Sequence, residues 1–191
     1  MEALLKQIHA NHSAALDAMM RDCTGDIVAM ATACADALAV EKKLLFCGNG
    51  GSACDAMHIA GEFVGRYVDD RRGLPALALS ADTGIITAVA NDYAYDYIFA
   101  RQVEALGQAG DVLVALSTSG KSPNVVRAIA AAKERGMTTV LMTGLKAKDL
   151  HRVADITIMV PSLITAHVQE GHMVALHAMA SLVESRLFPK A

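Results

Sequence analysis

The chain has 191 residues, with 17 Lys or Arg against 20 Asp or Glu, and therefore a formal charge of −3. Just over half of it is hydrophobic (53%), which excludes a disordered chain and predicts one domain with a sizeable core. The acidic balance, the lack of an apolar run of roughly 20 residues and the lack of a signal-peptide pattern predict a cytoplasmic protein that binds neither nucleic acid nor membrane.

The first 40 residues have the apolar spacing of helices, with few basic residues, which argues against a DNA-binding helix-turn-helix. The triplet Thr24-Gly25-Asp26 interrupts the pattern, which resumes at Ile27. This predicts a helical hairpin or one broken long helix, forming an N-terminal extension that serves oligomerisation.

Beyond residue 40, short apolar runs alternate with helical segments, which is typical of parallel sheets covered on both faces. The expected strands are Leu44–Cys47, Leu74–Leu79, Asp111–Leu116, Thr138–Met142 and Ile156–Val160. The expected helices are 52–66, 82–106 with an interruption near 91–92, 122–135 and 164–187. We therefore predict an α/β domain over 41–191, a five-stranded parallel sheet in a flavodoxin-like three-layer sandwich. The last helix is the most apolar and should be deeply packed or at a subunit interface.

The four cysteines form no Cys-x-x-Cys pair, and their spacing indicates neither a disulfide framework nor a zinc finger. They are expected to be reduced and to act as small core residues: Cys23, Cys34, Cys47 and Cys54.

Two glycine- or serine-rich loops follow the first and third expected strands. The first, Gly48 to Ser52, lacks the third glycine and the distal acidic residue of a dinucleotide fingerprint. The second, Ser117 to Ser122, ends in Gly-Lys-Ser but lacks the first glycine of a phosphate-binding P-loop. Its four hydroxyl groups exceed what one helix cap needs. Because both loops end strands of a parallel sheet, they predict a phosphorylated small molecule held at one sheet edge.

Polar residues interrupt two helices. His58 and Glu62 are four residues apart and share a helix face. Considered alone, this spacing indicates a surface ion pair or a coincidence. Gln169, Glu170, His172 and His177 lie on the apolar last helix, where they indicate either a site or a satisfied core network. His and Glu at helical spacing with another His could hold a divalent metal, and the same groups suit acid/base catalysis of aldose–ketose isomerisation.

Taken together, these motifs resemble the phosphoheptose isomerase family of the sugar-isomerase (SIS) domain superfamily. The resemblance covers Gly48 to Ser52, Asp55 to Glu62, Asn91-Asp92, Ser117 to Ser122 and Gln169 to His177. It implies conversion of D-sedoheptulose 7-phosphate to D-glycero-D-manno-heptose 7-phosphate, the first step toward nucleotide-activated heptose for lipopolysaccharide core or capsule. It also implies a cytoplasmic homotetramer with active sites at subunit interfaces and one zinc ion per subunit.

The resemblance assigns residue roles as well. It implies catalysis by Glu62 and His177. It implies zinc ligands at His58, Glu62, Gln169 and His177. It implies substrate contacts from Asn49, Gly50, Gly51, Glu62, Asn91, Asp92, Ser117, Thr118, Ser119, Ser122 and Gln169. The alternative is a non-catalytic SIS protein like the one that associates with the bacterial replication initiator, which lacks the catalytic Glu and His present here.

Overall fold

The protein folds around one parallel sheet with the strand order β2-β1-β3-β4-β5. The computed structural model describes residues 1–147 in full, the backbone of 148–150, and residues 153–190. The strands are β1 (Leu44–Gly48), β2 (Ala76–Ala78), β3 (Val112–Leu116), β4 (Thr138–Gly144) and β5 (Ile156–Val160). All the pairings are parallel, as predicted. Only β2 is notably shorter than expected, because it is an edge strand preceded by Pro75, which cannot donate to a ladder.

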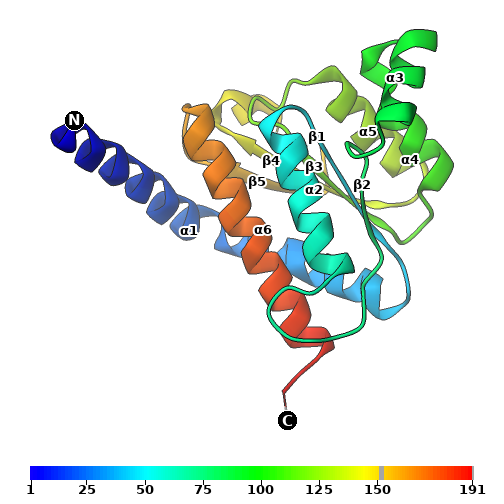
Figure 1. Cartoon of the computed structure of the whole chain (residues 1–191), viewed down its shortest axis with the longest axis horizontal. Coiled ribbons are helices and arrows are strands. Elements are labelled where there is room, and N and C mark those ends of the chain that lie inside the picture. Colours follow the sequence, from blue (N-terminus) through cyan, green and yellow to red (C-terminus); the bar gives the residue numbers. More distant parts are fainter. Residues whose placement is uncertain (151–152, 191) are drawn as a thin grey trace.

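Helices cover both faces of the sheet (Figure 1). They are α1 (Glu2–Ala39), α2 (Gly51–Val64), α3 (Thr83–Asp92), α4 (Ala100–Leu106), α5 (Pro123–Glu134) and α6 (Thr165–Leu187), with short 3-10 segments η1 (Tyr95–Tyr97) and η2 (Leu145–Leu150). Helices α1, α2 and α6 lie on one face, and α4 and α5 lie on the other. The result is the predicted three-layer sandwich.

Strand residues alternate between two buried clusters. Along β1, Leu44 and Phe46 pack against α1, α2 and α6, whereas Leu45 and Cys47 face α4 and α5. Both sets are fully buried, so the strand is apolar on both faces. This explains why the expected strands appear in the sequence as continuous apolar runs rather than as alternating ones.

The predicted break in the N-terminal helix is wrong. Helix α1 is continuous through Thr24, Gly25 and Asp26, all of which face solvent. Cys23 and Ile27, on either side, are buried in the core, so tertiary packing holds the helix together across residues of low helix propensity. The first turns, up to residue 14, extend beyond the sheet (Figure 1).

Helix α6 buries one face and exposes the other. Val168, Leu176 and Met179 are in the core, whereas Val174 and Leu182 are exposed. Cys54 on α2 is also exposed, so the expectation of a core cysteine is wrong there and holds for the other three. Among the described residues, no helix combines the length and apolar composition needed to cross a bilayer.

Candidate active site

The two predicted ligand loops lie side by side at the carboxyl edge of the sheet. β1 and β3 are neighbours, and their last residues, Gly48 and Leu116, are in register. At Gly48 an added Cβ would lie 2.6 Å from the carbonyl oxygen of Ser52, so only glycine permits this tight turn into α2. Gly50, the residue before α2, has a positive φ of 58°. The loop therefore presents backbone N–H groups at a helix N-terminus, an arrangement that favours anions.

The second loop has the same character. It leads from β3 into α5, and its Gly120 also has a positive φ, of 66°. The hydroxyl groups of Ser117 and Ser122 are 3.0 Å apart, and the N–H of Lys121 donates to the Ser119 hydroxyl at 3.2 Å. Thr118 is half-buried beside them. Hydroxyl groups and helix N-terminal amides thus gather where a phosphate could bind.

A side-chain network joins the two loops. The amides of Asn49 and Asn124 bond reciprocally, with N···O distances of 2.9 and 2.8 Å. Asn124 is buried in the first turn of α5. The hydroxyl of Tyr95, from η1, donates to the same Asn49 oxygen at 3.1 Å.

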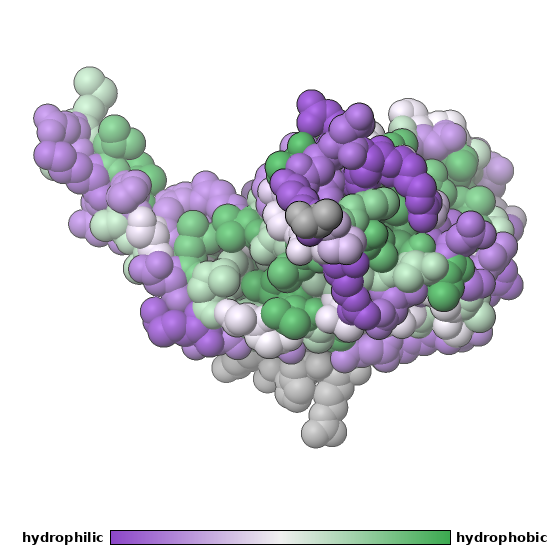
Figure 2. Space-filling model, turned by 90° about the horizontal axis from the view of Figure 1, so that it is seen from below, coloured by the Kyte–Doolittle hydropathy of each residue, from purple (hydrophilic) through white to green (hydrophobic). Residues whose placement is uncertain are grey.

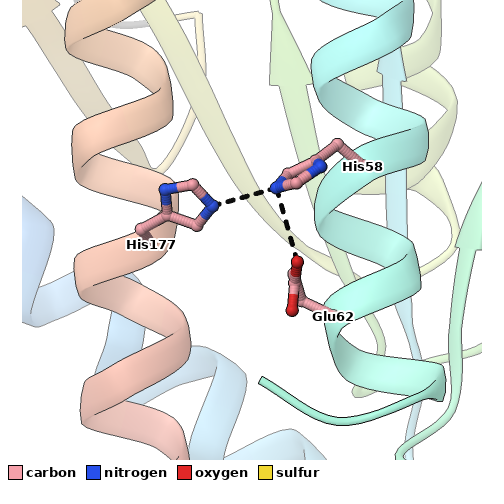
Figure 3. Close-up of side chains that lie close together, drawn as sticks. All are labelled: His58, Glu62 and His177. Atoms are coloured by element: carbon pink, nitrogen blue, oxygen red, sulfur yellow. Dashed lines mark hydrogen bonds and ion pairs between the residues drawn. The ribbon is translucent and has the colours of Figure 1, made fainter. Parts of the chain in front are cut away.

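The titratable cluster lies on the facing sides of α2 and α6 (Figure 3). His58 and Glu62 come from α2 and His177 from α6. The Nε2 atom of His58 is 2.9 Å from Nε2 of His177 and 3.4 Å from a carboxylate oxygen of Glu62. His58 and His177 are 119 positions apart in the sequence, so only the packing of α2 against α6 brings them together. Tyr67, in the segment after α2, stacks on the His177 ring with centroids 5.6 Å apart.

The cluster fits a transition metal. One ligand atom from each of the three residues lies within 4.8 Å of the others. Tetrahedral zinc with ligand bonds of about 2.1 Å places its ligand atoms about 3.4 Å apart. That value lies between the 2.9 Å that separates the two histidine Nε2 atoms and the 4.8 Å limit for the cluster. Two imidazoles and a carboxylate are also a typical catalytic donor set, which leaves one position for substrate or water.

Gln169 lies near the start of α6, away from the titratable cluster. A Cβ at Gly51 would come within 2.3 Å of the Gln169 amide nitrogen, so this side chain rests on the start of α2. Eight residues of helix separate Gln169 from His177, which is about 12 Å. Gln169 therefore borders the first ligand loop, and its role as a metal ligand stays a prediction.

A groove of about 460 Å³ between α2 and α6 adjoins this contact and is lined by Gly51, Asp55 and Gln169 among others. One carboxylate oxygen of Asp55 is buried and has no hydrogen-bond partner among the described residues. Burial raises the pKa of Asp55, and the charge of His58 offsets part of that rise. The groove thus adjoins the first ligand loop, at the start of α2.

Other predicted residues fall into different settings. Asn91 and Asp92 are exposed at the end of α3, bonded to each other at 2.8 Å. His172 is buried in the core rather than in the site. Glu170 is exposed and contacts His12 of α1. The polar residues of α6 thus divide between the site and the packing of the helix.

Comparison with known proteins identifies the family. The SIS domain family matches residues 8–144. A phosphoheptose isomerase of Geobacter sulfurreducens is 50% identical over 174 residues, covering 91% of this chain and 92% of the relative. The chain belongs to the phosphoheptose isomerase family.

Solved members of the phosphoheptose isomerase family have the same fold. The enzyme of Neisseria gonorrhoeae superposes with a TM-score of 0.89 at 38% identity, covering 96% of this chain and 98% of the other. The enzyme of Francisella tularensis superposes with a TM-score of 0.90 at 31% identity, covering 96% of this chain and 97% of the other.

Asn124 and Tyr67 are site neighbours that the sequence analysis missed. Asn124 lies two residues after the end of the Ser117 to Ser122 loop, which was a usable signal. Nothing in the local pattern marks Tyr67 as a partner of His177, because that contact depends on how the segment after α2 folds back onto α6.

Proposed function

We propose that this protein is a sugar-phosphate isomerase that converts D-sedoheptulose 7-phosphate to D-glycero-D-manno-heptose 7-phosphate. The observation that carries the proposal is that α2 and α6 bring His58, Glu62 and His177 together, in a fold whose two anion-favouring loops lie at one sheet edge. The product would supply nucleotide-activated heptose for lipopolysaccharide core or capsule, in the cytoplasm. The high identity to phosphoheptose isomerases over nearly the whole chain supports this substrate.

The phosphate is held by the second loop in this proposal. The hydroxyl groups of Ser117, Thr118, Ser119 and Ser122 and the amides at the start of α5 act as donors, which need no long-range cationic field. The sugar then extends toward the first loop, where Asn49, Gly50 and Gly51 contact it, together with Gln169, Asn91 and Asp92. Local geometry thus allows a protein of charge −3 to bind an anion.

Isomerisation requires one proton to move between adjacent carbons and another between their oxygens. In the proposed mechanism Glu62 takes the proton from C1 of the ketose and delivers it to C2. His177 gives a proton to the C2 oxygen and takes one from the C1 oxygen, so the substrate passes through an enediol and both side chains return to their starting states.

The residues also suit zinc. His58, Glu62 and His177 would hold it, and the bound ion would polarise the substrate carbonyl or order the two catalytic side chains. Because Gln169 is about 12 Å along the helix from His177, we place its zinc contact across a subunit interface of a homotetramer. The N-terminal extension, residues 1–40, would serve that assembly, with 41–191 as the SIS domain.

The test is to replace the two proposed catalytic residues. Glu62→Gln and His177→Gln should each lower turnover of sedoheptulose 7-phosphate by roughly 10²–10⁴-fold, because each removes a positioned acid or base. Matched controls are Glu134→Gln and His9→Gln, which change exposed residues away from the site. Turnover near that of the unmodified protein in either site variant would contradict the assigned roles.

Metal removal separates the enzyme from the binding-protein alternative. Treatment with a chelator should abolish turnover, and zinc should restore it. A folded protein that isomerises no sedoheptulose 7-phosphate with or without added zinc would favour a non-catalytic SIS protein instead.

A further inference from the structure

The orientation of the Asn49 amide is set by its neighbours. Its oxygen accepts two hydrogen bonds, from the Asn124 amide at 2.8 Å and from the Tyr95 hydroxyl at 3.1 Å. Its nitrogen donates one N–H to the Asn124 oxygen at 2.9 Å. A flipped Asn49 would lose both bonds to Asn124, because oxygen would face oxygen and nitrogen would face nitrogen. Asn124 therefore sets the orientation of the amide, and the Tyr95 hydroxyl holds the Asn49 oxygen in that orientation.

One hydrogen of the Asn49 amide remains. Among the side chains that the structure describes, its nitrogen has no second acceptor, and Asn49 itself is only half-buried. The free N–H belongs to the loop that begins at the end of β1, directly before the N-terminus of α2. It is therefore a donor available to a ligand at the sheet edge.

The three members of the network come from three separate parts of the chain. Asn49 follows β1, Tyr95 belongs to η1, and Asn124 is the second residue of α5, which follows the proposed phosphate loop. Asn124 is 2% exposed, and its oxygen also accepts from the backbone N–H of Val125 at 3.0 Å. The buried Asn124 is thus fixed at two points, whereas Tyr95 is mostly in solvent.

We propose that Tyr95 and Asn124 are positioning residues that fix the Asn49 amide as a hydrogen-bond donor to the sugar of the bound sugar phosphate. This rests on the proposed function, because it takes the substrate to lie against the first loop. Asn124 links the first loop to the helix that follows the phosphate loop. The positions of the sugar and the phosphate are therefore fixed relative to each other. Tyr95 adds a bond from η1, which closes the network on its solvent side.

Tyr95→Phe is the decisive variant, because it removes one hydroxyl from an exposed side chain and should leave the fold intact. Its control is Tyr93→Phe in the same segment, since the Tyr93 hydroxyl meets Arg101 and not Asn49. With sedoheptulose 7-phosphate, Tyr95→Phe should raise KM by about threefold to tenfold, the effect of one neutral hydrogen bond, with a smaller change in kcat. Tyr93→Phe should match the unmodified protein.

Asn124→Asp is the second variant. It keeps the shape of the side chain but replaces the donor to Asn49 by an oxygen, so the Asn49 amide loses its fixed orientation. We expect a larger rise in KM than for Tyr95→Phe. If Asn124→Asp does not fold, Tyr95→Phe decides alone.

A second readout needs no substrate. The side-chain NH₂ resonances of Asn49, assigned by comparison with Asn49→Ala, should shift in Tyr95→Phe and stay in place in Tyr93→Phe. If the protein isomerises the sugar and Tyr95→Phe has an unchanged KM, the positioning role is overturned and the proposed function stands. If the protein does not isomerise the sugar, the function fails, and unshifted Asn49 resonances in Tyr95→Phe would overturn the network as well.

Discussion

His172 and His177 show how two residues of one type on the same helix take different roles. His177 is half-buried and faces α2, where its ring meets His58. His172 is fully buried, and its Nε2 lies 3.4 Å from the carbonyl oxygen of Thr143. Its Nδ1 has no hydrogen-bond partner in the part of the chain that the structure describes. Burial lowers the pKa of His172 to about 4. It is therefore a neutral core residue, and the folded protein resists its protonation.

The buried histidine predicts acid sensitivity. Its pKa is lower in the folded than in the unfolded protein, where it is about 6.5, so the stabilisation is complete above that value and is lost as the pH falls toward about 4. Between pH 7 and pH 5 this one group should cost about 2 kcal/mol of unfolding free energy. Urea unfolding at both pH values, at fixed protein concentration, measures it.

The matched variant is His172→Leu, which should lose that part of the pH dependence. His9→Leu, which replaces an exposed residue of α1, should keep it. Equal pH dependence of the His172→Leu variant and the unmodified protein would contradict the assignment.

At the scale of the elements, two glycines within helices have opposite settings. Gly25 lies on the solvent side of α1, and no atom of another described segment lies within 4 Å of an added Cβ. Gly171 is buried in α6, where an added Cβ would lie 2.9 Å from Val160 of β5 and 3.2 Å from the sulfur of Met19 on α1. Gly171 thus lets α6 approach both the sheet and α1 closely. Gly25 permits no such close approach between the described elements.

The same substitution should therefore have opposite effects at the two sites. Gly25→Ala should stabilise the protein by about 0.5–1 kcal/mol, because alanine is the better helix former. Gly171→Ala should destabilise it by about 1 kcal/mol or more, since overpacking costs roughly 1–3 kcal/mol and exceeds the gain in propensity. Thermal or urea unfolding of both variants gives the comparison, and a stabilised Gly171→Ala protein would show that the helices can move apart freely.

At the scale of the whole molecule, the N-terminal arm extends away from the sheet and carries exposed apolar residues (Figure 2). Leu4, Leu5 and Ile8 are 64%, 66% and 45% exposed. They continue, at helical spacing, the stripe that α1 buries from Ala15 onward. A single subunit leaves these side chains in water, which supports the proposed assembly into a homotetramer.

Ile8→Glu should therefore weaken the assembly, because it places a charge in the apolar stripe of the arm. Light scattering during size-exclusion chromatography should show a smaller species at low protein concentration. Gln7→Glu, on the adjacent polar side of the arm, should keep the mass of the unmodified protein. A constant mass for Ile8→Glu at all concentrations would exclude the arm from the interface.

Local patterns in the sequence were enough to predict the strands, the helices apart from the continuity of α1, and the position of both ligand loops, because periodicity and glycine content are local properties. They also predicted that Ser117 to Ser122 would lie near Gly48 to Ser52, since parallel strands end at one edge. The known pattern of a family, rather than spacing, singled out the full set of site residues.

Other features depended on the tertiary structure. Packing of Cys23 and Ile27 keeps α1 continuous where propensity favours a break. The packing of α2 against α6 brings the Nε2 atoms of His58 and His177 to 2.9 Å. The same packing places the Gln169 side chain against Gly51, at the start of α2 and away from His177. The network of Asn49, Tyr95 and Asn124 joins the loop after β1 to η1 and α5. Contacts between residues far apart in sequence arise from helix and sheet packing, which no local pattern encodes.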